Sequence, residues 1–74
     1  MKTKKELLEK KYDEILDMVV ATEAEIAFLK KKDPESEMIN QFGGKQKIST
    51  ILEDYERALE NHNLRIKVIE ELIK

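Results

Sequence analysis

The spacing of apolar residues constrains the fold of this chain more than any other feature of its sequence. In both halves, apolar side chains recur at steps of three and four residues, which places them on one side of an α-helix. This seam runs through Leu8, Tyr12, Ile15, Val19, Thr22, Ile26 and Leu29, and again through Ile48, Leu52, Tyr55, Leu59, His62, Ile66, Ile69 and Ile73. Neither stretch contains Gly or Pro, and residues of high helix propensity fill both. We therefore predict two long helices, over about residues 3–31 and 47–74.

The segment between these helices holds the only Pro and both Gly residues of the chain. Asp33 followed by Pro34 is typical of a helix N-cap and a first helical position. Gly43 is typical of a left-handed residue that ends a helix. We predict a short connecting helix over about residues 34–42.

The start of the second long helix has its own candidate signal. Thr50 and Glu53 have the spacing of a capping box, in which two side chains bond to the first free backbone N–H groups of a helix. We expect this helix to begin between Lys45 and Thr50.

Both long helices carry more apolar surface than one hairpin can bury. Leu16 and Phe28 lie off the seam, and Leu64, Val68 and Leu72 form a second row at steps of four. A helix that is apolar on several sides must contact several neighbours. We predict an all-α helical hairpin that dimerises into an antiparallel four-helix-type bundle with two-fold symmetry. The predicted dimer core comprises Tyr12, Ile15, Leu16, Val19, Ile26, Phe28, Leu29, Leu52, Tyr55, Leu59, Ile66 and Ile69.

The length of 74 residues also favours self-association. Ordering that many residues costs about 110 kcal/mol at roughly 1.5 kcal/mol each. Offsetting this cost requires about 4,400 Å² of apolar burial at roughly 25 cal/mol per Å². A compact sphere of this mass reaches about that value, and a rod of two helices buries less. We expect a single domain over residues 1–74 that is stabilised by a second copy.

The sequence predicts no catalytic, cofactor or metal site. The chain has no Cys, which excludes disulfides, Cys-based zinc sites and a Cys nucleophile. A di-metal bundle would have a Glu three residues before each metal-binding histidine. The residue three before His62, the one histidine, is Leu59. Gly43, Gly44 and Lys45 lack the spacing of a phosphate-binding loop. We interpret His62 as a partly buried core residue or as a polar layer that fixes helix register, and we expect neither an enzyme nor a small-molecule substrate.

The longest apolar runs are four residues, at 18–21 and 26–29. Such runs are too short for a signal peptide or a membrane span, so we predict a cytoplasmic protein without a membrane partner. The net charge is −2, and residues 13–29 hold five acidic residues and no basic ones.

Nucleic acid is an alternative partner. Lys2, Lys4, Lys5, Lys11 and the lysines beside the turn could form basic ends on a small regulatory dimer. The four aromatic residues provide no stacking platform for bases. A third interpretation is that the protein binds a host enzyme and inhibits it.

The C-terminal segment favours a protein partner. Its second apolar row either belongs to the bundle core or forms an amphipathic surface that docks in a groove of another protein. The predicted partner-binding residues are Leu64, Arg65, Ile66, Lys67, Val68, Leu72, Ile73 and Lys74. We therefore expect a non-catalytic dimeric interaction module that serves as an assembly scaffold or adaptor.

The layout of the whole chain, with the tripeptides at 65–67 and 72–74, resembles the small helical scaffolding and capsid size-determination proteins of phages and phage satellite islands. The resemblance implies a helical dimer whose C-terminal helices engage capsid subunits, transiently inside a procapsid. It also implies which residues would contact the capsid: Arg65, Ile66, Lys67, Ile73 and Lys74.

Overall fold

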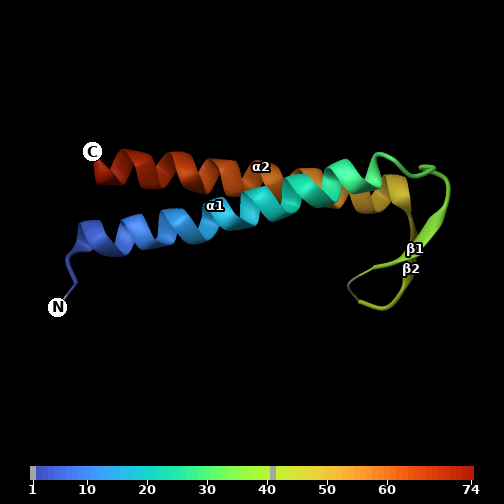
Figure 1. The fold of residues 1–74 in the computed structure, drawn as a ribbon, viewed down its shortest axis with the longest axis horizontal. Coiled ribbons are helices and arrows are strands. Elements are labelled where there is room, and N and C mark those ends of the chain that lie inside the picture. The colour runs from blue at the N-terminus through green and yellow to red at the C-terminus, as the bar shows by residue number, and fades with distance from the viewer. Residues whose placement is uncertain (1, 41) are drawn as a thin grey trace.

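The computed structural model describes residues 2–40 and 42–74. Helix α1 (Lys4–Leu29) is followed by strands β1 (Glu37–Ile39) and β2 (Lys45–Lys47) and by helix α2 (Ile48–Ile73). The two helices run antiparallel, and the two strands form a β-hairpin at the end of the rod opposite both termini (Figure 1). The molecule extends 49 × 20 × 14 Å. The two predicted long helices are therefore confirmed, while the all-α description is corrected by the small sheet.

The heptad seam of each helix packs against the other helix within the same chain. Its buried members are Ile15, Val19, Ile26 and Leu29 on α1 and Ile48 and Ile69 on α2, and Ile51, which lies beside the α2 seam, is buried with them. Leu29 and Ile48 are the most deeply buried, with 2% and 1% of their surface exposed. They lie at the β-hairpin end, and the ribbons diverge toward the termini (Figure 1). The tightest part of the core is thus next to the β-hairpin.

Helix α1 begins with a side-chain N-cap at Thr3. The Thr3 hydroxyl accepts a hydrogen bond from the backbone N–H of Glu6 at 3.2 Å and lies 3.3 Å from the Glu6 carboxylate. This arrangement satisfies a backbone donor that has no partner inside the helix. The helix ends at Leu29, shortly before Pro34, whose ring disfavours helical backbone in the preceding residue.

The predicted short helix over residues 34–42 is wrong, because the described part of this segment forms a turn and a β-strand. Its remaining residue, Gln41, lies outside the described residues. The Asp33 side chain accepts from the backbone N–H of Glu35 at 3.0 Å, and the Asp33 carbonyl accepts from the backbone and side chain of Ser36. Asp33 therefore closes a tight turn instead of starting a helix.

The β-hairpin is antiparallel, with Glu37 opposite Lys47 and Ile39 opposite Lys45. Opposite charges on facing residues favour this register. The turn is held by Asn40, whose side-chain oxygen accepts from the backbone N–H groups of Phe42 at 2.9 Å and Gly44 at 3.1 Å.

Gly43 has a φ of +85° and so takes the left-handed conformation expected from the sequence. It does so in the β-hairpin turn, where its backbone N–H donates to the Asn40 carbonyl at 3.0 Å, and not at the end of a helix. A left-handed glycine satisfies either context, which is why the residue alone did not distinguish them.

The N-terminus of α2 is capped by the backbone of the turn. The N–H of Ile48 donates to the carbonyl of Ser36 at 2.8 Å, and the N–H of Ser49 donates to the carbonyl of Pro34 at 3.1 Å. These bonds satisfy two of the N–H groups that a helix start leaves free. The helix begins inside the predicted range, but the capping box predicted at 50–53 is wrong. The same bonds fix the β-hairpin against the helices.

Candidate protein-binding surfaces

The second apolar row of α2 lies on the outside of the hairpin. Leu64, Val68 and Leu72 are 56%, 51% and 54% exposed, while Ile69 on the neighbouring face is buried. Their steps of four residues place them in one stripe along the helix. We call Leu64, Val68 and Leu72 the outer row of α2.

The other predicted partner-binding residues divide into two groups. Arg65, Lys67 and Lys74 are exposed. Ile66 and Ile73 are half-buried and share the core side of the helix with Ile69, to which they are spaced by three and four residues. Those two isoleucines therefore contribute to the hairpin core and not to an outer docking surface.

Most of the predicted dimer core is already used within one chain. Ile15, Val19, Ile26, Leu29 and Ile69 are buried, and Tyr12, Leu52, Tyr55, Leu59 and Ile66 are half-buried. Of the predicted set, Leu16 and Phe28 are exposed. The heptad seams thus hold the hairpin together, and a second copy would have to use surfaces beside them.

Helix α1 carries further exposed apolar side chains beside its seam. Leu16 and Val20 each follow a buried seam residue by one position, which turns them about 100° away from the core. Met18 is also exposed. The acidic residues of segment 13–29 surround these side chains, so this part of α1 is both apolar and negatively charged.

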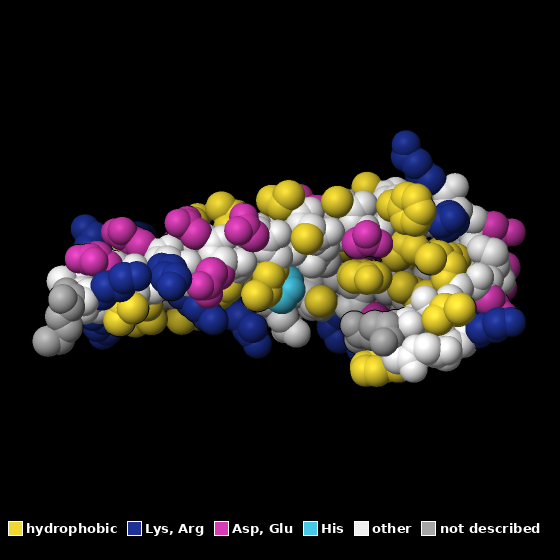
Figure 2. Space-filling model, turned by 60° about the horizontal axis from the view of Figure 1, so that its bottom comes forward, with side chains coloured by type: hydrophobic (Ala, Val, Ile, Leu, Met, Phe, Trp, Pro, Cys, Tyr) yellow, Lys and Arg dark blue, Asp and Glu magenta, His cyan; other side chains and the backbone are white. Residues whose placement is uncertain are grey.

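A groove of about 260 Å³ lies where the β-hairpin meets both helices. Figure 2 shows apolar side chains gathered at this end of the rod. Ile39 and Phe42 line the groove from the β-hairpin and are 68% and 86% exposed. The complete lining is Glu25, Leu29, Met38, Ile39, Asn40, Phe42, Gln46, Ile51, Asp54, Tyr55 and Ala58. We call this set the hairpin groove.

The charged residues lining the hairpin groove are both acidic. Glu25 comes from α1 and Asp54 from α2. Arg57 approaches Asp54 at 3.9 Å, but both side chains are exposed, and such surface pairs bind weakly. The groove therefore combines apolar walls with carboxylates that remain free to bind a cation.

Sequence reasoning missed this groove because it placed Met38, Ile39 and Phe42 on a helix. The signal for the alternative was Asn40 followed by the Gly43–Gly44 pair, which is typical of a β-hairpin turn. Once the two strands are assigned, the apolar side chains of the β-hairpin can be recognised as part of an exposed surface.

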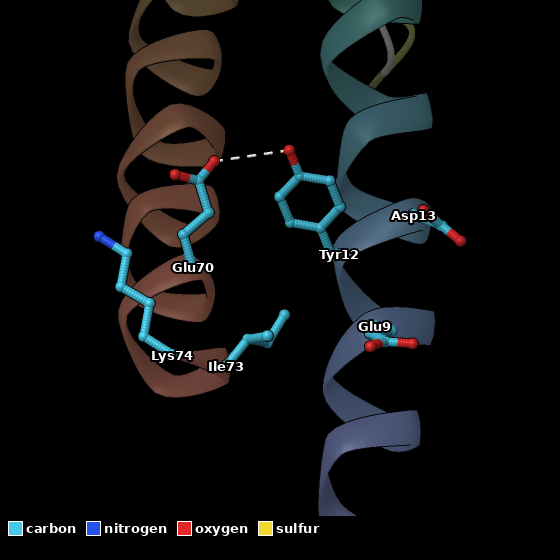
Figure 3. Close-up of a pocket in the computed structure, with 6 residues that line it drawn as sticks. All are labelled: Glu9, Tyr12, Asp13, Glu70, Ile73 and Lys74. Carbon is cyan, nitrogen blue, oxygen red and sulfur yellow. Dashed lines mark hydrogen bonds between the residues drawn. The ribbon is translucent and has the colours of Figure 1, made fainter.

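A second, wider hollow of about 520 Å³ lies between the diverging helix ends near the termini. It is lined by Glu9, Tyr12, Asp13, Glu70, Ile73 and Lys74. The Tyr12 hydroxyl donates to a Glu70 carboxylate oxygen at 3.4 Å, and the Asp13 carboxylate points away from this pair (Figure 3). Among the described residues, no group of three His, Cys, Asp or Glu side chains is arranged to hold a metal ion.

His62 is half-buried on the seam of α2. Its Nδ1 atom is buried and has no hydrogen-bond partner within the described part of the chain. A buried nitrogen without a partner destabilises the hairpin, because it has lost its bond to water. The position agrees with a core histidine; a role in fixing helix register remains a prediction.

The predicted basic residues form two separate groups. Lys2, Lys4, Lys5 and Lys11 lie at the end that carries the termini, whereas the lysines at 30–32, 45 and 47 lie at the β-hairpin end (Figure 1). Lys47 is also paired with Glu35 at 3.1 Å. The structure does not join the two groups into one basic face.

Neither α1 nor α2 has the length and apolar character needed to cross a membrane, within the residues that the structure describes. The chain matches no protein-family model, no curated protein and no solved structure. Function is therefore inferred from the surfaces described above.

Proposed function

We propose that this protein is a non-catalytic interaction module. One copy pairs with another, and the outer row of α2 then docks on a protein partner. The observation that carries the proposal is the outer row itself: Leu64, Val68 and Leu72 stay half-exposed after the hairpin has closed.

The total exposed surface supports a partner. The chain exposes 5947 Å². A compact monomer of 8.7 kDa exposes roughly 4,700 Å². The excess is comparable with the roughly 800 Å² that each partner buries in a standard interface. Pairing would bury this excess surface, including several apolar side chains that a single chain leaves exposed.

The outer row has the spacing of a helix that docks in a groove. Three apolar side chains at steps of four residues form the apolar contact, and exposed Arg65 lies next to Leu64 as an orienting cation. The partner should therefore offer an apolar groove with an acidic edge. The resemblance of residues 65–67 and 72–74 to capsid size-determination proteins makes a capsid subunit the first partner to test.

The experiment compares two triple variants of the immobilised protein. The test variant carries Leu64→Ser, Val68→Ser and Leu72→Ser, and the control carries serine at exposed Glu56, Glu60 and Asn63. Both should keep their circular dichroism spectra, because none of the six side chains is buried.

A protein partner from source cells, identified by mass spectrometry, should bind the wild type and the control but not the test variant. Its retention should change little between low and physiological salt, because the contact is apolar. Equal capture by the test variant would contradict the proposed docking row. Retention of nucleic acid that falls steeply with salt would instead support the basic ends as the binding surface.

A further inference from the structure

We propose that the hairpin groove of one copy receives the N-terminal end of α1 from a second copy, in an antiparallel dimer. The proposal rests on the self-association proposed above and specifies its geometry. In this dimer, a groove that is apolar and acidic contacts a helix end that is apolar and basic.

The knob is centred on Leu7, which is 53% exposed near the start of α1. Three lysines surround Leu7 on the same side of the helix: Lys4 is three residues before it, and Lys10 and Lys11 are three and four residues after it. All three lysines are exposed, and Lys11 approaches Glu14 only at 3.9 Å. These cations are free to pair with the groove carboxylates. We call Leu7 with these lysines the basic knob.

The hairpin groove is complementary to the basic knob. Its free volume of about 260 Å³ is large enough for a leucine side chain and part of a lysine stem. Glu25 would then face the lysines of the incoming chain. Burial of Leu7 would also cover Ile39 and Phe42, the apolar side chains that the β-hairpin leaves in water.

The knob and the groove lie on the same face of the hairpin. Leu7 precedes Glu25 by 18 residues, which is about five full helical turns, so both side chains point to the same side of α1. Asp54 precedes Leu72 by the same 18 residues on α2. One face therefore carries the groove at the β-hairpin end and Leu7 with Leu72 at the other end, about 27 Å away along the helices.

This equal spacing fits a two-fold dimer. When a second copy is turned end for end and placed on this face, Leu7 lies over Glu25 of the other copy and Leu72 over its Asp54, so that Leu64 and Val68 are the members of the outer row left for the protein partner. Two-fold symmetry forms each contact twice. A face along a rod 49 Å long and 14–20 Å wide can supply the roughly 800 Å² per partner that a standard interface buries.

Charge selects this arrangement over the parallel one. A parallel dimer through the same face would bring the carboxylates of both grooves together at one end and both sets of lysines at the other. Like charges that face each other across an interface are unfavourable. The antiparallel arrangement pairs them with opposite charges instead.

The first test is a charge exchange measured by sedimentation. Replacement by Glu25→Lys and Asp54→Lys should weaken dimerisation at least about tenfold, and Lys4→Glu with Lys11→Glu added to the same chain should restore it. The matched control, Asp13→Lys with Asp17→Lys, makes the same change in net charge away from this face and should leave the dimer unchanged. Equal dimerisation of the groove variant and the control would overturn the proposal.

The second test is disulfide cross-linking, for which the absence of Cys makes single-cysteine variants specific. Chains with Leu7→Cys and chains with Glu25→Cys should form a cross-linked pair only when they are mixed. Glu25→Cys chains that cross-link with one another would show the parallel arrangement and overturn this proposal while leaving self-association intact. A wild-type chain that stays monomeric would instead remove the proposed self-association itself.

Discussion

The hydroxyl group of Tyr12 lies 3.4 Å from a carboxylate oxygen of Glu70, and this hydrogen bond joins α1 to α2 where the helices diverge (Figure 3). The bond is long and exposed, so water competes with it. The ring of Tyr12 is half-buried and belongs to the seam. Packing of the ring, more than the hydrogen bond, should hold this end of the hairpin closed.

Removal of the Tyr12 hydroxyl should therefore have little effect. Tyr12→Phe should lower the free energy of unfolding by less than about 0.5 kcal/mol, whereas Tyr12→Ala, which also removes the ring, should lower it by about 1–2 kcal/mol. Urea unfolding at one protein concentration measures both. An equal loss in the two variants would show that the hydrogen bond is the dominant contact.

Truncation of two neighbouring residues of α1 should lower the free energy of unfolding by very different amounts. Leu29 is almost fully buried, so Leu29→Ala should lower the free energy of unfolding by about 2–4 kcal/mol. Phe28 is exposed, with the Lys32 ammonium group 4.8 Å from its ring centre, so Phe28→Ala should lower it by less than about 1 kcal/mol. Urea unfolding again provides the measurement, and a larger loss at Phe28 would contradict the described core.

The two adjacent glycines offer a matched test of the turn. Gly43 has a positive φ, so Gly43→Ala should lower the free energy of unfolding by about 1–2 kcal/mol although there is open space around it. At Gly44 an added methyl group would meet only ordinary contacts with Asn40, at 3.7 Å and beyond. Gly44→Ala should therefore change the free energy by less than about 0.5 kcal/mol. Equal effects would argue against the left-handed turn.

Replacement of the unpaired histidine should stabilise the hairpin. His62→Leu removes a buried nitrogen without a partner and should raise the free energy of unfolding by about 1 kcal/mol, or the melting temperature by about 4–8 °C. Asn63→Leu, at the exposed neighbouring position, is the control and should leave both unchanged. A loss of stability in His62→Leu would mean that Nδ1 has a partner in solution, such as a second copy.

The heptad spacing was sufficient to predict both long helices because each seam is repeated over several turns. Local capping signals were less informative. The Thr-x-x-Glu spacing occurs at residues 3–6, where it forms a real cap, and at 50–53, where the helix has already begun. The difference lies in the Ser36 and Pro34 carbonyls, which accept hydrogen bonds from the first backbone N–H groups of α2 and so replace a side-chain cap.

Local sequence signals were equally ambiguous in the segment that connects the two helices. Asp33 can cap a helix or close a turn, and a left-handed Gly43 can end a helix or turn a β-hairpin. In the structure, Glu37 pairs with Lys47 across the β-hairpin, and this contact between two strands is not visible in either local signal alone. The outer row of α2 was identified from spacing, whereas the hairpin groove required the strands to be placed first.

Self-association is the claim on which the proposed function and the dimer geometry both depend. Sedimentation equilibrium of the wild-type chain at micromolar concentrations tests it most directly. We expect a particle of twice the chain mass of 8.7 kDa, which dissociates on dilution. A folded species of 8.7 kDa at every concentration, with a melting temperature independent of concentration, would contradict it.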